Sequence, residues 1–216
     1  MAKIPSPPPL ASLVEIGADE KVIPAGMTFF RVYFRSSRHA VTWRTFRIYG
    51  PTDARFDHHL RPSREQPRGI LYVAIHPRTA LAEVFQRRRT INTRRMHPWL
   101  VGVETTAELR LLDLTGLWPT RLDASMALST GPHARTRPWS RAAYEAYPEL
   151  HGLWYGSAMD SMRGCAALFE RGAPAMPPSP AFHRALADPA LRALLEHWAR
   201  ELNYRLILED ARNAGC

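Results

Sequence analysis

The stretch Gly69–Arg89, which reads G-I-L-Y-V-A-I-H-P-R-T-A-L-A-E-V-F-Q-R-R-R, decides the fold because it predicts a buried strand leading directly into a helix. Residues 70–75 are apolar on both faces, which is typical of a central strand. His76-Pro77 ends this strand, since proline is well tolerated at the first position of a helix. A 3.6-residue period gives the helix one apolar face, made of Ala80, Leu81, Val84 and Phe85.

Glu83 lies just outside this apolar face and has two interpretations. It can pair with Arg87 one turn later on the surface, which stabilises a helix by about 0.3–0.5 kcal/mol. Alternatively, the buried strand that carries Tyr72 can hold the carboxylate rigidly at a cleft. Structural ion pairs are common, so this stretch alone favours the surface pair.

The composition indicates a soluble globular protein with a single domain. The 216 residues are 45% hydrophobic and 23% charged, enough for a substantial core. The two cysteines, Cys165 and Cys216, are too far apart to suggest a metal site, and they form no disulfide framework. No secretory leader and no membrane-length apolar run is evident, so we expect a cytoplasmic protein with no membrane partner.

The positive charge is concentrated in one segment. Residues 31–95 contain 15 arginines, no lysine and four acidic residues, so this segment carries +11 of a chain whose net charge is +9. Such a surface is expected to attract a polyanion, a phosphate-bearing ligand or an acidic protein.

An aromatic strand is predicted over residues 28–34, T-F-F-R-V-Y-F. Alternation places Arg31 and Tyr33 on the face of Phe29, and the opposite face, with Phe30, Val32 and Phe34, is the expected core. An arginine between two aromatic residues is either a ligand-binding group or a side chain that extends past them to solvent.

The polar segment 35–68 is long for a loop inside a compact domain, and such loops are usually functional or mobile. It contains Asp57-His58-His59, which suggests a metal site. Adjacent histidines in a strand point to opposite faces, however, and no further ligand follows at a suitable spacing, so no metal is expected.

The remaining segments predict an α+β domain. We expect strands at 99–106, 108–114, 153–157, 165–169 and 204–208, and helices at 139–147 and after Asp188-Pro189, with turns over 115–135. Cys165 is interpreted as a small buried hydrophobic residue rather than a nucleophile. The expected organisation is a tail and lead-in over 1–27, a core over 28–172, and a proline-rich linker, helix and final strand over 173–216 in the same domain.

Four segments together resemble the RES-domain family, which is named for its arginine, glutamate and serine. They are F-F-R-V-Y, Y-G-P-T-D-A-R-F-D, G-I-L-Y-V-A-I-H-P-R-T-A-L-A-E-V-F and G-L-W-Y-G-S-A-M-D-S. Each motif alone is weak, but their order and spacing over about residues 28–170 are fairly specific. The corresponding catalytic residues are Arg31, Glu83 and Ser157.

The resemblance implies a toxin of a bacterial type II toxin–antitoxin pair, with an ADP-ribosyltransferase-like fold of two small sheets around an NAD cleft. It implies cleavage of the nicotinamide–ribose bond of NAD and transfer of ADP-ribose to a protein, to phosphate or to water. It also implies a cognate antitoxin, usually of the Xre helix-turn-helix type, that covers the cleft.

These residue types suit such chemistry. Arginine binds a pyrophosphate through bidentate, charge-assisted hydrogen bonds, and Arg31 is the best candidate. Arg47, Arg55 and Asp57 are the next candidates for the pyrophosphate or adenosine end. Tyr33 and Tyr72 offer flat rings for nicotinamide or adenine. Glu83 is expected to stabilise an oxocarbenium-like ribose, as carboxylates do in glycosidases. Ser157 is expected to position the ribose, because no base is placed beside it.

Two other functions remain open at this point. The +11 segment, with the interleaved aromatic residues Trp43, Phe46, Tyr49 and Phe56, fits a nucleic-acid-binding module without NAD chemistry. An inactive scaffold that complements an acidic partner is the third possibility. Within the enzyme hypothesis, the arginine-rich segment 35–68 slightly favours a protein acceptor.

Overall fold

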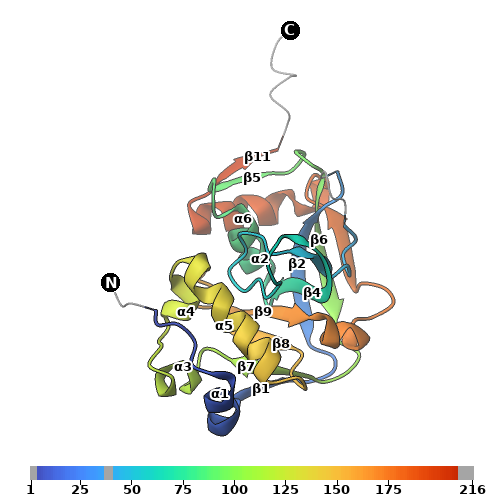
Figure 1. Ribbon diagram of the computed structural model, residues 1–216. Coiled ribbons are helices and arrows are strands. Elements are labelled where there is room, and N and C mark those ends of the chain that lie inside the picture. The colour runs from blue at the N-terminus through green and yellow to red at the C-terminus, as the bar shows by residue number, and fades with distance from the viewer. Residues whose placement is uncertain (1–3, 37–40, 209–216) are drawn as a thin grey trace.

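The computed structural model describes residues 4–36 and 41–208 (Figure 1). Cys216 and the end of the predicted C-terminal segment lie outside these ranges. In chain order the elements are α1 (Leu10–Ile16), β1 (Glu20–Ile23), β2 (Thr28–Phe34), β3 (Arg47–Gly50), β4 (Arg64–Ala74), α2 (Pro77–Phe85), β5 (Thr90–Asn92), β6 (Pro98–Glu104), β7 (Leu109–Asp113), α3 (Trp118–Arg121), α4 (Ala127–Thr130), α5 (His133–Ala146), β8 (Gly152–Gly156), β9 (Gly164–Phe169), η1 (Glu170–Ala175), β10 (Phe182–Ala185), η2 (Pro189–Leu191), α6 (Arg192–Leu202) and β11 (Arg205–Ile207). The predicted α+β class is confirmed.

Most strands belong to one nine-stranded sheet with the order β1-β7-β8-β9-β4-β2-β6-β10, in which β3 also pairs with β4. Neighbouring strands run antiparallel except β7 and β8, which are parallel. A separate two-stranded sheet joins β11 to β5 in parallel. None of the helices in the described ranges is long and apolar enough to span a bilayer.

The main sheet is nearly divided between β2 and β4. These two strands share a single residue pair, Phe30 with Ala74, whereas β2 pairs with β6 over seven residues. The sheet therefore has two halves, β1-β7-β8-β9-β4 and β2-β6-β10, that meet at one point and separate beyond it. This separation opens the space that becomes the candidate site.

Both faces of the sheet are buried, as the apolar strand in Gly69–Arg89 predicts. Ile70 and Ala74 belong to one hydrophobic cluster, and Leu71 and Val73 belong to the other. Helix α5 covers the first cluster, in front of β7, β8 and β9 in Figure 1. A central strand that packs on both sides needs apolar residues at every position.

The prediction for the faces of β2 needs correction. Phe29 and Tyr33 are almost fully buried in the second cluster, while Phe30 and Phe34 on the expected core face are only partly buried. The physical reason is that Phe30 and Val32 line the opening between β2 and β4. The alternation of residues correctly predicted which side chains share a face of β2. It did not predict which of the two faces is more deeply buried.

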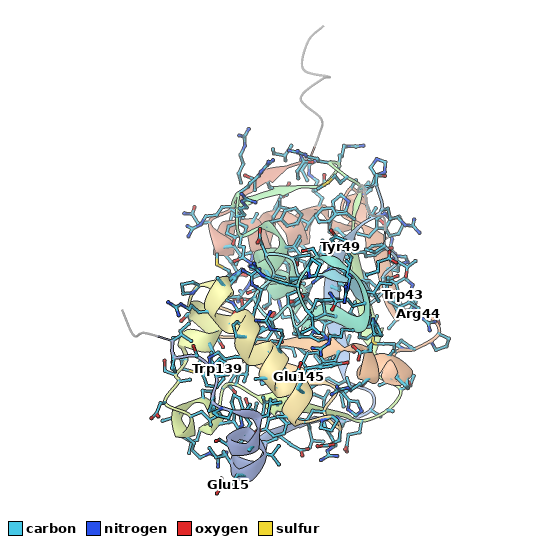
Figure 2. The ribbon with its side chains drawn as sticks, in the orientation of Figure 1. Glu15, Trp43, Arg44, Tyr49, Trp139 and Glu145 are labelled. Atoms are coloured by element: carbon cyan, nitrogen blue, oxygen red, sulfur yellow. The ribbon has the colours of Figure 1, made fainter. Side chains whose placement is uncertain are left out.

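The helices differ from the predictions mainly near the N-terminal side of α5. The turn-rich interpretation of 115–135 is wrong, because α3, α4 and the first residues of α5 lie there. Tertiary contacts stabilise the first two turns of α5. Thr136 Oγ1 donates a hydrogen bond to the Arg55 carbonyl at 2.6 Å. Trp139, labelled in Figure 2, donates from Nε1 to the Pro5 carbonyl at 2.9 Å. Ile4 and Pro5 therefore pack against the molecule rather than extending from it.

Candidate active site

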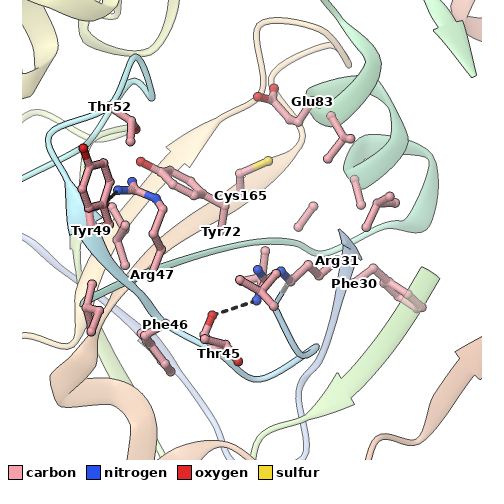
Figure 3. Close-up of a pocket in the computed structure, with 18 of the residues that line it drawn as sticks. Phe30, Arg31, Thr45, Phe46, Arg47, Tyr49, Thr52, Tyr72, Glu83 and Cys165 are labelled. Carbon is pink, nitrogen blue, oxygen red and sulfur yellow. Dashed lines mark hydrogen bonds between the residues drawn. The ribbon is translucent and has the colours of Figure 1, made fainter. Parts of the chain in front are cut away.

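A cavity of about 610 Å³ lies where β2 and β4 separate, which is the size of a typical small-molecule site (Figure 3). Strands β2, β3 and β4, helix α2 and the segment before β3 form its walls. The lining residues are Phe30, Arg31, Val32, Val41, Thr45, Phe46, Arg47, Ile48, Tyr49, Thr52, Glu65, Ile70, Tyr72, Val73, Ala74, Ala80, Glu83, Val84, Tyr155 and Cys165. Four of the predicted site residues, Arg31, Arg47, Tyr72 and Glu83, are among them.

Glu83 is held at the cavity wall by helix α2, whose first turn begins at Pro77 with His76 as its N-cap. The Ser157 hydroxyl donates a hydrogen bond of 2.5 Å to Glu83 Oε1, and Gln86 Nε2 donates to the Glu83 carbonyl at 2.7 Å. No ion pair with Arg87 occurs within the described ranges, so the surface interpretation of Glu83 is wrong. The core-face prediction for Val84 also fails, because Val84 is 38% exposed at the cavity rim.

Ser157 is fully buried and contacts Glu83 rather than lining the cavity. It follows directly after β8, where Gly156 permits close packing, since a Cβ there would lie 2.4 Å from Met162 Cε. The tight turn closes when the Met162 amide donates to the Ser157 carbonyl at 2.9 Å. The serine that the sequence singled out is thus a neighbour of the glutamate.

Asp160 connects the turn after β8 to the start of α2 through hydrogen bonds. Its carboxylate accepts hydrogen bonds of 2.6 Å from Arg78 Nη2 and from Thr79 Oγ1, and it is only 4% exposed. Burial alone would raise the pKa of Asp160, but these hydrogen bonds hold it below its usual range. Sequence reasoning missed this role, although Asp160 stands in the quoted segment G-L-W-Y-G-S-A-M-D-S.

Arg31 lines the cavity from β2 and supports the segment that covers it. Its Nη1 donates to the carbonyls of Trp43 at 3.1 Å and Thr45 at 3.3 Å, the second of which is drawn in Figure 3. Burial lowers the pKa of Arg31 to about 10, so the guanidinium stays charged at neutral pH. A guanidinium has five N–H donors, which leaves donors for a ligand.

Arg47 reaches the cavity from β3, where two acceptors hold it. Its Nη2 donates to Asp57 Oδ2 at 2.9 Å, and its Nη1 donates to the Tyr49 carbonyl. The buried Asp57 carboxylate also accepts from the Thr52 amide at 2.6 Å and from His59 Nδ1 at 2.6 Å. Although burial opposes ionisation, these hydrogen bonds hold the pKa of Asp57 far below its usual range.

Arg55 and Tyr72 lie near one another, since the charge of Arg55 acts on the Tyr72 hydroxyl. Arg55 is not a lining residue: its Nη1 donates to the Gly131 carbonyl, and burial lowers its pKa while the nearby charge of Glu83 opposes the shift. The Tyr72 ring lines the cavity. Its hydroxyl, near the Phe56 backbone, makes no hydrogen bond of normal geometry within the described residues, and burial raises its pKa.

Tyr33 lies apart from the cavity. It is 3% exposed in the second hydrophobic cluster, and its hydroxyl is 2.7 Å from His183 Nε2. The structure therefore brings Arg31, Arg47, Tyr72, Glu83 and Ser157 together, with Arg55 behind them, and separates Tyr33 from them.

Tyr155 and Cys165 are cavity residues that sequence reasoning did not assign to a ligand site. The signal for Tyr155 was present, because alternation places it on the same face of β8 as Ser157. Burial raises the pKa of both side chains well above the ordinary values, with Glu83 as an additional cause for each. The Cys165 thiol is therefore protonated at neutral pH, in agreement with its interpretation as a small buried residue rather than a nucleophile.

Asp57, His58 and His59 are part of the protein interior. All three side chains are fully buried, and Asp57 binds Arg47 and His59. Across residues 4–36 and 41–208, no three His, Cys, Asp or Glu side chains are grouped to hold a metal ion.

The aromatic residues of the basic segment are only partly available to a nucleic acid. Phe56 is fully buried, and Trp43 and Phe46 pack against the second hydrophobic cluster, whereas Tyr49 is 49% exposed. Trp43, Arg44 and Tyr49 are labelled in Figure 2. Because a buried ring cannot stack on a base, Phe56 cannot be one of the residues that would bind a nucleic acid.

Comparison with known proteins adds three findings. The family model of the RES domain matches residues 28–194. A chain from the crystal structure of the M. tuberculosis MbcT–MbcA toxin–antitoxin complex has a similar fold, with a TM-score of 0.56 and 15% sequence identity over 87% of this chain and 97% of that chain. A search of the curated proteins finds no match.

Proposed function

This chain belongs to the RES domain family, and on that premise we propose that it cleaves the nicotinamide–ribose bond of NAD and transfers the ADP-ribosyl group. The observation that carries this proposal is the Ser157–Glu83 hydrogen bond of 2.5 Å at the wall of a cavity that is also lined by two arginines and three tyrosines. NAD is the substrate, and the reaction assigned to these residues requires no metal.

Glu83 supplies the electrostatic part of the reaction. When the C1′–N bond breaks, its electron pair leaves with nicotinamide, and the ribose becomes oxocarbenium-like. A carboxylate beside this ribose stabilises the developing positive charge, a contribution commonly worth roughly 3–4 kcal/mol. Ser157 acts through Glu83 as a positioning residue, because its hydroxyl fixes one carboxylate oxygen.

The remaining cavity residues suit the other parts of NAD. Arg31 and Arg47 are charged groups with spare N–H donors for the diphosphate, and each is held by acceptors of the protein. Tyr72 offers a ring for the nicotinamide or the adenine, and its buried hydroxyl makes no hydrogen bond of normal geometry within the described residues. Arg55 contributes its charge from behind this wall, whereas Tyr33 has no direct role in the proposal.

We further propose that the chain is the toxin of a type II toxin–antitoxin pair, acts in the cytoplasm and arrests growth by this reaction. The shared fold with a chain of the MbcT–MbcA complex supports a cognate antitoxin, and an Xre-type protein that covers the cavity is the expected form. The acceptor is most simply a protein side chain, for which the arginine-rich segment 35–68 offers a docking surface. Phosphate and water are the alternative acceptors.

The direct test is incubation of the purified protein with NAD, with and without cell lysate, while free nicotinamide and labelled protein bands are followed. Nicotinamide release with labelled bands supports transfer to protein, and release without bands supports phosphate or water as acceptor. Absence of nicotinamide in both conditions, together with salt-sensitive binding to DNA or RNA, would instead support the nucleic-acid-binding module.

The Glu83→Gln substitution is the first specific prediction. We expect nicotinamide release to fall by about 10²–10³, because the variant keeps the shape of the side chain but loses the negative charge. The partly exposed Glu196→Gln on α6 is the matched control and is expected to retain full activity. Undiminished NAD cleavage and toxicity in Glu83→Gln would show that this carboxylate has another role.

A further inference from the structure

A second concave region lies beside the central cavity and is lined by different chemistry. It has a volume of about 820 Å³ and is formed by Pro51, Thr52, Asp53, Arg61, Pro62, Ser63 and Arg137. Thr52 borders both spaces, so the two are neighbours. No large apolar side chain lines this second region, which we call the basic hollow.

Two arginines, Arg61 and Arg137, line the basic hollow, and two more, Arg141 and Arg68, lie near them. Arg61 comes from the segment before β4, Arg137 comes from α5, and Arg141 follows Arg137 by one helical turn on the same face. Arg68 lies close enough for its charge to act on Arg141. These four guanidinium groups come from two separate parts of the chain that the fold brings together.

The carboxylates nearby do not balance this charge. Asp53 Oδ1 lies 3.7 Å from Arg137 Nη1, but its side chain is fully exposed to solvent. Glu145, labelled on α5 in Figure 2, pairs with Arg68 at 2.9 Å. Four arginines and two carboxylates leave a local charge of +2.

The charges of this cluster repel one another. Burial lowers the pKa of Arg141, and the neighbouring charges of Arg137 and Arg61 lower it further. Arg137 uses Nη1 to donate to the Thr52 carbonyl. Neither Arg61 nor Arg141 makes a side-chain hydrogen bond or close ion pair within residues 4–36 and 41–208, so their planar forks are available to an anion.

We propose that the basic hollow binds the phosphoryl groups of a phosphorylated ligand other than the NAD in the central cavity. Guanidinium forks hold phosphate oxygens through bidentate, charge-assisted hydrogen bonds, and a bound dianion offsets the repulsion among Arg61, Arg137 and Arg141. The polar lining matches a ligand recognised by its charge rather than by an apolar ring. The proposal concerns binding only and does not depend on NAD cleavage.

The test is isothermal titration calorimetry of the full chain with inorganic pyrophosphate. We expect Arg61→Gln/Arg141→Gln to weaken pyrophosphate binding by about ten- to a hundredfold, since two charge-assisted contacts are lost. Arg135→Gln removes one positive charge from an exposed position elsewhere on α5 and is expected to bind like the wild type. Circular dichroism melting of each variant confirms that it is folded.

A second titration separates the basic hollow from the central cavity. Because Arg31 and Arg47 in that cavity can also bind a diphosphate, NAD at saturation is used to fill it, and pyrophosphate is expected to bind the hollow within about twofold of its affinity without NAD. The proposal is overturned if the wild type does not bind pyrophosphate at millimolar concentration, if the double variant binds normally, or if saturating NAD abolishes binding.

Discussion

Glu83 illustrates how a single side chain depends on a distant neighbour. The local helix offered Arg87 as a partner, but the observed partner is Ser157, which is 74 residues away in the chain. The carboxylate remains at the cavity wall because its oxygen is held by a buried hydroxyl. A helical pattern predicts neighbours one turn away but contains no information about a loop that arrives from another strand.

Glu170 is a second carboxylate whose neighbours determine its ionisation. Burial would raise its pKa, but the His58 imidazole nearby, the Tyr144 hydroxyl at 2.6 Å and the Gly69 amide at 2.7 Å lower the pKa to about 2. The His58 ring lies 3.8 Å away, which is too far for a hydrogen bond, so we assign the shift mainly to Tyr144 and Gly69.

This lowered pKa predicts acid sensitivity. Because the folded pKa is below the ordinary value of 4.5, the carboxylate stabilises the fold above about pH 4.5 and loses this contribution as the pH falls toward about 2. We expect Glu170→Gln to cost on the order of 2 kcal/mol of unfolding free energy at pH 7, after allowance for partial exposure, and much less at pH 3. Urea unfolding across this range measures the difference.

The exposed Glu149→Gln is the control for acid sensitivity and is expected to change the unfolding free energy little at any pH. If the difference between wild type and Glu170→Gln were the same at pH 7 and pH 3, the ionisation of Glu170 would not contribute to folding.

At the scale of elements, the turn 157–163 and helix α2 form one unit. Arg78 and Thr79 at the start of α2 donate to Asp160 in the turn, and Glu83 near the end of α2 accepts from Ser157. Two points of attachment at opposite ends of the helix fix how the turn lies against it. The position of the glutamate is therefore a property of both elements together.

Asp160→Ala tests this attachment. We expect a loss of about 2–3 kcal/mol in unfolding free energy, because Arg78 and the buried Thr79 lose charge-assisted hydrogen bonds. If the proposed reaction is correct, kcat for nicotinamide release falls more than KM rises, since Glu83 remains present but is less well positioned. Guanidinium unfolding and steady-state kinetics measure the two effects.

Asp160→Asn is the conservative comparison, because its amide oxygen still accepts one hydrogen bond. It is expected to lie between the wild type and Asp160→Ala in both measurements. Normal kcat in Asp160→Ala would mean that Ser157 keeps its position without this attachment.

At the scale of the whole molecule, the site exists because the sheet has two halves. Strands β2 and β4 meet only at Phe30 and Ala74, and the cavity takes residues from both. The expected pair of sheets around a cleft corresponds to these halves, although hydrogen bonding at one point joins them into one sheet. Burial on both faces holds the halves in position.

Trp118 tests the packing that supports the first half. It is 1% exposed, and its Nε1 donates to the Gly17 carbonyl and the Tyr147 hydroxyl, each at 3.1 Å. We expect Trp118→Ala to lower the unfolding free energy by about 3–5 kcal/mol, because it leaves a large cavity between α1, α3 and α5. The adjacent Leu117 is 70% exposed, and Leu117→Ala is expected to change stability by about 0.5 kcal/mol or less.

Urea denaturation of both variants checks this expectation. Equal stability of Trp118→Ala and Leu117→Ala would show that the tryptophan does not support the core.

The sequence by itself determined the central strand, the helix that follows it, the α+β class and the order of the family motifs, because these depend on periodicity and on residues close together in the chain. Only the tertiary structure decided that Glu83 pairs with Ser157 rather than Arg87, that Tyr33 is remote from the cavity, and that Arg61 and Arg137 share one hollow. These outcomes depend on how β2 separates from β4 and on which loops close over the opening. Such contacts are set by packing between distant segments, which a local pattern of residues does not encode.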